Sequence, residues 1–132
     1  MASALVVPVQ ASELLVKVSN IPASSGEIGC ALFSAAPGFP TDPSRAKVLW
    51  QPAQRGSLVC RFEGIAAGRY AVSVSHDLNG NRKTDTKMFG IPTEDWGVSN
   101  NVRHRLRPPK FEEAAVSVTD GQTLTIDVEL GR

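Results

Sequence analysis

The sequence Leu14-Leu15-Val16-Lys17-Val18-Ser19, which ends at Asn20-Ile21-Pro22, decides the fold class of this chain. Its even-numbered positions from 14 to 18 are all apolar, whereas Lys17 and Ser19 are polar. Because successive side chains of a β-strand point to opposite faces, apolar residues at every second position bury one face and leave the other in solvent. Pro22 lacks the amide hydrogen that a sheet requires and marks the end of the strand. We therefore predict a half-buried strand from Leu14 to Ser19.

The same alternation recurs along the rest of the chain. Pro37, Pro40 and Pro43 interrupt it and predict a loop, followed by a short edge strand over Lys47 to Gln51. Asp120-Gly121 is a strong hairpin signal, so we expect residues 114–118 and 124–130 to pair with each other. The inward-facing side chains that we predict are Ile28, Cys30, Leu32, Leu58, Cys60, Phe62, Tyr70, Val72, Val74, Ala114, Val116, Val118, Leu124, Ile126, Val128 and Leu130.

These strands predict an all-β protein, an antiparallel β-sandwich of six to seven strands with one long functional loop. The 132 residues suffice for a single domain, and a hydrophobic share of 42% excludes a disordered chain. The net charge of +1 gives no reason to expect nucleic acid as a partner. No apolar run approaches the roughly 18 residues of a membrane span, so none is expected.

The first residues indicate a compartment. Residues 2–11 are uncharged and mostly apolar, and Val9-Gln10-Ala11 fits the small-x-small pattern of a signal peptidase site. We interpret residues 1–11 as the remnant of an export signal and residues 12–132 as the single sandwich domain, which predicts a periplasmic or secreted protein. The alternative is an ordinary first strand or chain end, because no basic region precedes the apolar residues.

Cys30 and Cys60 are the two cysteines of the chain, and both fall on the inward side of their strands. In an oxidising compartment they would form a disulfide that closes a loop of about 30 residues and stabilises the fold by roughly 3 kcal/mol. In the cytosol they would be two buried thiols. Export favours the disulfide. The preference is only slight, because inward orientation alone does not show that the two strands are neighbours.

Between Asp77 and Pro109 the alternation is lost over about 30 residues, far more than usually connects two elements of a compact domain. Oxygen-bearing side chains at alternate positions from Asp77 onward can point at one centre, as in looped calcium sites. Calcium is therefore the one cofactor that the sequence suggests. The predicted ligands are Asp77, Asn79, Asn81, Lys83 through its carbonyl, Asp85 and Glu94.

A second interpretation of the same turn needs no ion. The aspartate and asparagine side chains can accept hydrogen bonds from their own backbone amides in consecutive Asx turns, with Gly80 at positive φ. Arg82, Lys83 and Lys87 favour this alternative, because their positive charges weaken the binding of a cation.

The later part of the long segment carries candidate binding residues. Residues 82–110 contain seven Lys or Arg against three acids, while residues 111–132 contain one against five. The cations either form an anion-binding edge or pair with acids on neighbouring strands, and the second alternative is favoured. Trp50 and Trp96 either offer a stacking surface for a sugar or peptide or cover the core. The candidate binding residues are Trp96, Ser99, Asn100, Asn101, Arg103 and Arg105.

Catalysis would have to use the two histidines. His76 and His104, with Asp77 and Arg103, would give a small hydrolase its acid–base groups if the chain brought all four into one cleft. The chain has no phosphate-binding glycine loop and no His-Glu-x-x-His or Gly-x-Ser-x-Gly motif. We therefore prefer a non-enzymatic binding module, in which residues 77–101 form a recognition surface, stabilised by calcium, for a cell-envelope protein or glycan.

The long segment also resembles a known family. His76-Asp77-x-Asn79-Gly80-Asn81-x-Lys83-x-Asp85 precedes Phe89-Gly90-Ile91-Pro92-x-Glu94-x-x-Gly97-x-Ser99-Asn100-Asn101. The two motifs in this order resemble the signature of an exported bacterial family, domain of unknown function 2141, which implies export and no particular activity. The sequence Phe62-Glu63-Gly64-Ile65-Ala66-Ala67-Gly68-Arg69-Tyr70-Ala71-Val72 is similar to a strand entrance of transthyretin-like sandwiches. It implies a transthyretin-like or immunoglobulin-like fold, with Tyr70 packed at the start of its strand.

Overall fold

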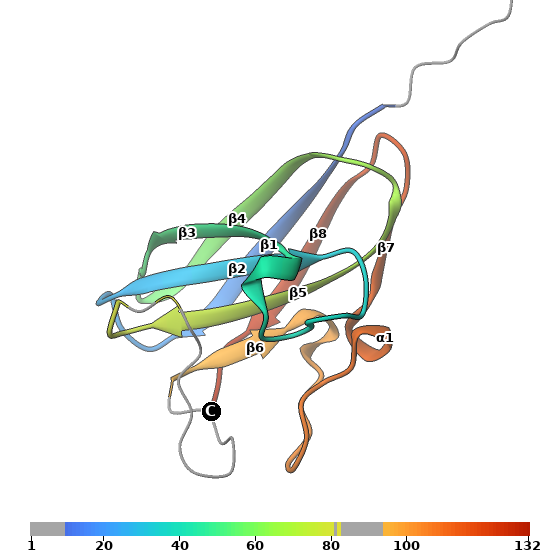
Figure 1. Ribbon diagram of the computed structural model, residues 1–132. Coiled ribbons are helices and arrows are strands. Elements are labelled where there is room, and N and C mark those ends of the chain that lie inside the picture. The colour runs from blue at the N-terminus through green and yellow to red at the C-terminus, as the bar shows by residue number, and fades with distance from the viewer. Residues whose placement is uncertain (1–9, 81, 83–93) are drawn as a thin grey trace, which may run out of the picture.

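The computed structural model describes residues 10–80, 82 and 94–132, and these form an all-β sandwich of two sheets (Figure 1). The fold class predicted from the alternating pattern is confirmed. One sheet has the strand order β4-β1-β8, and the other has the order β3-β2-β5-β6, with β7 also paired to β5. The strands are β1 (Ser12–Ile21), β2 (Glu27–Phe33), β3 (Lys47–Pro52), β4 (Gly56–Ile65), β5 (Gly68–Asp77), β6 (Trp96–Val98), β7 (Val116–Val118) and β8 (Thr123–Glu129).

The smaller sheet is built around β1. This strand pairs with β4 in antiparallel orientation, with Val16 opposite Cys60, and with β8 in parallel orientation, with Val16 opposite Ile126. The side chains of Leu14, Val16 and Val18 are fully buried, as the pattern predicts. The parallel pair of β1 and β8 departs from the wholly antiparallel sandwich that we expected.

The hairpin predicted across Asp120-Gly121 is wrong. The turn itself is present, since Gly121 has a φ of 71° and the Gln122 amide donates to the Thr119 carbonyl oxygen at 3.1 Å. However, β7 pairs with β5 in the larger sheet, and β8 crosses to the smaller sheet. The turn therefore joins the two sheets. Alternation fixes which face of a strand is buried, but it does not fix which strand lies beside it.

The core lies between the sheets and contains nearly all the predicted inward side chains. Tyr70 is only half-buried; it packs against this core at the start of β5 and donates its hydroxyl to the Ala66 carbonyl oxygen at 2.6 Å. A disulfide joins Cys30 on β2 to Cys60 on β4, with the two Cα atoms 6.6 Å apart and both side chains fully buried. This bond ties one sheet to the other through the middle of the core.

A second apolar cluster covers the outer face of the larger sheet. Phe33 on β2 meets Phe39 edge to face with ring centroids 5.2 Å apart, and Phe39 meets Phe111 in the same way at 6.1 Å. Phe39 lies in the proline-rich loop 34–46, which contains the 3₁₀ turn η1 (Pro43–Arg45). Phe111 begins the short helix α1 (Phe111–Ala114), which the sequence did not reveal because four residues are too few to display a helical period.

The described helices are too short and too polar to cross a membrane.

Candidate functional site

Strand β6 lies within the long segment 77–109, at the corner where the two sheets meet. β6 pairs with β5, with Ser75 opposite Trp96 and Ser73 opposite Val98. Its other side lies directly against the end of β8, because a Cβ atom on Gly97 would come within 2.5 Å of the Glu129 carbonyl oxygen. Only glycine allows this approach. Gly97 therefore holds the larger sheet against the smaller one.

Ser99 continues this junction inside the protein. Its side chain is fully buried, and its hydroxyl accepts from the Val72 amide at 2.9 Å and donates to the Ala114 carbonyl oxygen at 2.5 Å. One hydroxyl group thus connects the middle of β5 to the end of α1. The structure therefore places Ser99, a predicted binding residue, inside the protein with its hydroxyl in internal hydrogen bonds.

Asn100 and Asn101 bond other parts of the backbone. Both residues adopt left-handed backbone conformations, with φ of 60° and 52°, which asparagine tolerates better than most residues. The Asn100 amide group donates to the carbonyl oxygens of Glu113 and Ala115, at 3.2 and 3.1 Å. The Asn101 side-chain oxygen accepts from the Glu129 amide on β8 at 2.9 Å. The Ser99-Asn100-Asn101 motif therefore joins β5, α1 and β8.

We predict that Ser99→Ala destabilises the fold by about 1–3 kcal/mol, because it leaves the Val72 amide and the Ala114 carbonyl buried without their partner. The free energy of unfolding, measured by urea denaturation, tests this. Ser117→Ala, at an exposed position on β7, is the matched control and should change the stability by less than about 0.5 kcal/mol. Equal stability of the two variants would contradict the structural role of Ser99.

The turn after β5 closes through its own amides. Asp77 is almost fully buried, and its carboxylate accepts from the Gly80 amide at 3.1 Å and from the Arg82 amide at 2.7 Å. Gly80 has a φ of 79°, and Glu94 accepts from the Leu78 amide at 2.6 Å. Asp77 thus accepts from amides of its own turn, as the interpretation without an ion expects, but from residues three and five positions on rather than from the residue two positions on of an Asx turn.

Three of the six predicted calcium ligands, Asn81, Lys83 and Asp85, lie outside the described residues. In the part of the chain that is described, no three His, Cys, Asp or Glu side chains gather closely enough to hold a metal ion. Asp77 and Glu94 flank the same turn, but these two side chains do not supply the six to eight oxygens that calcium requires. Calcium binding at this turn stays a prediction.

The four residues of the hydrolase alternative have different neighbours. His76 is fully buried, and its Nε2 atom donates to the Ser25 carbonyl oxygen at 2.7 Å. His104 instead contacts Glu113 at 2.7 Å. Ser99 bonds both the Val72 amide and the Ala114 carbonyl, so α1, which carries Glu113, lies beside Val72 on β5. Val72 and His76 are about 13 Å apart along this strand. Within the described residues, His76 and His104 therefore bond different segments of the chain, Ser25 and Glu113.

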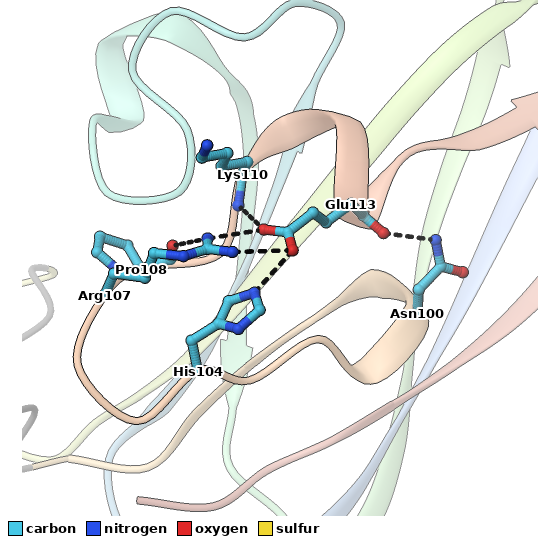
Figure 2. Close-up of polar contacts among 6 residues, drawn as sticks. All are labelled: Asn100, His104, Arg107, Pro108, Lys110 and Glu113. Atoms are coloured by element: carbon cyan, nitrogen blue, oxygen red, sulfur yellow. Dashed lines mark hydrogen bonds and ion pairs between the residues drawn. The ribbon is translucent and has the colours of Figure 1, made fainter.

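Glu113 on α1 is the centre of a polar cluster that the sequence did not reveal (Figure 2). Its carboxylate accepts from His104 at 2.7 Å, from the Arg107 guanidinium at 2.9 and 3.2 Å, and from the Lys110 amide at 2.9 Å. The hydrogen bond from Arg107 and the one from the Lys110 amide lower the pKa of Glu113 to about 2. This cluster fixes the loop before α1, and within the described residues it gives Arg107 an acidic partner.

The low pKa of Glu113 predicts an acid-dependent loss of stability. In the folded state the pKa is about 2, below the ordinary value of 4.5, so the ionised carboxylate favours folding above pH 4.5. This contribution declines as the pH falls from 4.5 towards 2. We expect Glu113→Gln to lower the melting temperature near neutral pH and to approach the parent protein in this acid range.

Thermal melts of both proteins between neutral pH and pH 2 measure the difference. Glu112→Gln, which removes the neighbouring carboxylate bound to Arg69, is the control and should follow the parent more closely across the range. A constant difference between Glu113→Gln and the parent at every pH would contradict the prediction.

Trp96 and Arg103 form a pair at the corner of β6. The Arg103 guanidinium lies 3.8 Å from the centroid of the Trp96 ring and donates to the Trp96 carbonyl oxygen, and burial lowers its pKa. Arg103, Asn101 and Arg132 line a hollow between β6 and the end of β8, and Trp96 lies beside it under Arg103. The Arg132 guanidinium pairs with Asp95 at 3.1 Å. The structure therefore brings Trp96, Asn101 and Arg103 together, but in internal contacts. Arg105 is exposed.

The second tryptophan has a different setting. Trp50 on β3 lies opposite Gly29 on β2, and a Cβ atom on Gly29 would come within 2.4–2.8 Å of three atoms of the indole ring. The ring therefore rests on the backbone of β2, on the outer face of the larger sheet. The Arg82 guanidinium lies 5.1 Å from the ring centroid and pairs with Glu27 at 3.2 Å.

These side chains border a groove on the outer face of the larger sheet, which we call the Trp50 groove. Its floor consists of small residues of β2 and β5, among them Ser73 and Ser75. Neither serine hydroxyl makes a hydrogen bond within the part of the chain that the structure describes. The sequence named Trp50 as a stacking candidate but did not reveal the groove, because its residues come from separate strands. The lining residues are Gly29, Ala31, Phe33, Pro40, Thr41, Pro43, Val48, Trp50, Ser73, Ser75 and Arg82.

Fold and site together define a disulfide-linked β-sandwich with an open groove on one sheet and a signature segment that closes one corner. The chain belongs to the family described as "Uncharacterized protein conserved in bacteria (DUF2141)", whose model matches residues 16–126, from β1 into β8. This match confirms the family that the two sequence motifs indicated. No curated protein and no solved structure matches the chain.

Proposed function

We propose that this protein is an exported, non-enzymatic binding module and that the Trp50 groove binds a glycan of the bacterial cell envelope. The observation that carries the proposal is that one groove is lined by Trp50, by the paired Arg82 and by two serine hydroxyls that make no hydrogen bond within the described residues. Sugar rings offer apolar C–H faces for aromatic contact and hydroxyl groups for hydrogen bonds. A mainly apolar pocket with a few placed polar groups is the usual form of a small-ligand site.

Two features support export. Residues 2–11 resemble the end of a signal peptide, and the Cys30–Cys60 disulfide is of the kind that persists in oxidising compartments. Export would place the groove in the periplasm or outside the cell, where envelope glycans are accessible. A glycan is preferred over a protein partner because the groove combines an aromatic ring with serine hydroxyls on a floor of small side chains, between Trp50 and the proline-rich loop.

Titration of the purified protein with soluble peptidoglycan fragments and with N-acetylglucosamine oligomers tests the proposal. We expect saturable binding, seen by calorimetry and as a change in tryptophan fluorescence. Trp50→Ala should weaken it about tenfold or more, since aromatic anchors dominate such contacts. Gly29→Ala should weaken it as well, because the new Cβ atom displaces the indole ring.

Two further variants separate ligand contact from folding. The double variant Ser73→Ala, Ser75→Ala removes only hydroxyls that have no protein partner within the described residues, so it should weaken binding without changing the melting temperature. Trp96→Phe, at the tryptophan stacked under Arg103, is the control and should bind like the parent. Binding that is absent, or that is unchanged in the double variant and in Gly29→Ala, would refute the proposal.

The proposed stabilisation of residues 77–101 by calcium has its own test. Calcium should raise the melting temperature of the parent protein relative to chelator, and Asp85→Ala should remove the rise, because binding to the folded state alone stabilises it. Asp77→Ala is a poorer choice, since Asp77 also accepts from two amides. No change up to about 10 mM calcium, beyond the range of extracellular calcium modules, would contradict calcium binding.

A further inference from the structure

The segment between the 3₁₀ turn η3 (Ser99–Asn101) and α1 forms a loop that extends away from both sheets (Figure 1). We call residues 102–110 the basic loop. It contains Arg103, His104, Arg105, Arg107 and Lys110 and no acidic residue. The proposed groove on the outer sheet face has no residue in common with this loop.

The basic loop has a fixed base. The Glu113 carboxylate accepts hydrogen bonds from His104 and from Arg107, and the Lys110 amide donates to the same carboxylate (Figure 2). Arg107 also donates to the Pro108 carbonyl oxygen at 3.2 Å. The two side chains that lie between these attachments, Arg105 and Leu106, are therefore held at the tip.

The tip exposes an apolar side chain beside a cation. Leu106 is 93% exposed, the highest value among the large apolar side chains that the structure describes. Arg105 is exposed and makes no ion pair within the described residues, and Lys110 is exposed at the end of the loop. Glu113, the acid that binds His104 and Arg107, is directed to the base of the loop rather than to its tip.

We propose that the basic loop is a contact site for an anionic phospholipid surface. Leu106 enters the interface between headgroups and acyl chains, while the neighbouring Arg105 binds a lipid phosphate. A membrane fits better than a protein partner, because a tip of two or three residues buries far less than the roughly 800 Å² per side of a specific protein interface. A fluid lipid surface can instead close around a narrow tip.

Sedimentation of the purified protein with lipid vesicles tests this contact. The protein should bind vesicles of phosphatidylglycerol and phosphatidylcholine, and it should bind much less to phosphatidylcholine alone. Arg105→Ala should lower the partition coefficient about fivefold. Leu106→Ser should lower it about tenfold, because the inserted apolar side chain is lost. Both changes lie at an exposed tip and should leave the melting temperature unchanged.

Arg55→Ala is the matched control, because it removes the same charge from an exposed turn between β3 and β4. It should keep the parent's partition coefficient within twofold. In addition, brominated lipid should quench the fluorescence of a tryptophan introduced by Leu106→Trp more than that of the parent. These results would support insertion of the tip.

Several outcomes would overturn the proposal. They are an absence of binding to anionic vesicles, equal loss of binding in Arg55→Ala and Arg105→Ala, and unchanged binding in Leu106→Ser. Inorganic phosphate could also release the protein from vesicles at an ionic strength at which chloride does not. That result would show a site for free phosphate or for a soluble acidic partner instead. None of these outcomes bears on glycan binding, so the two proposals fail independently.

Discussion

The hydroxyl group of Ser99, which accepts from Val72 and donates to Ala114, is the interaction on which the corner of this sandwich depends. It fixes α1 against the middle of β5, and β7 follows α1 onto the same edge of that strand. Asn101 and Gly97 attach β8 of the other sheet to the same segment. Because these groups are buried or closely packed, each polar atom must find a partner inside the protein. The junction therefore tolerates little change in residue type.

This junction shows that several polar residues of the family signature make internal hydrogen bonds. Asp77, Ser99, Asn100 and Asn101 direct their polar atoms at backbone groups of neighbouring segments. Polar residues in a loop suggest ligand contact, but a buried backbone imposes the same need for polar side chains. The surfaces that we propose for ligands lie elsewhere, in a groove on the outer sheet face and at the tip of the basic loop. Of the residues that form these two surfaces, only Arg82 lies within the span of the two motifs, at one of its variable positions.

Part of the candidate site could be predicted from the sequence, and part could not. Hydrogen bonds from the Asp77 side chain to its own turn were an open alternative because they link residues only three and five positions apart. Trp50 was named as a stacking residue, but its groove also needs Gly29, Ser73 and Arg82, which three separate segments supply. Glu113 was expected to pair with basic residues, yet its place between His104 and Arg107 follows from a short helix with no detectable period. The roles of residues close together in the sequence could be predicted, whereas contacts between distant segments could not.

The sequence by itself determined that the chain is a β-sandwich and which side chains enter its core, because burial of alternate residues is a local property of each strand. It also indicated the family, through two ordered motifs. Only the tertiary structure decided that β8 runs parallel to β1, that β7 belongs to the other sheet, and that the cysteines face each other across the core. Strand pairing depends on long-range packing, and many pairings satisfy the same alternating pattern. The physical reason is that a strand's hydrogen-bonding groups are identical along every edge, so the rest of the fold selects its neighbour.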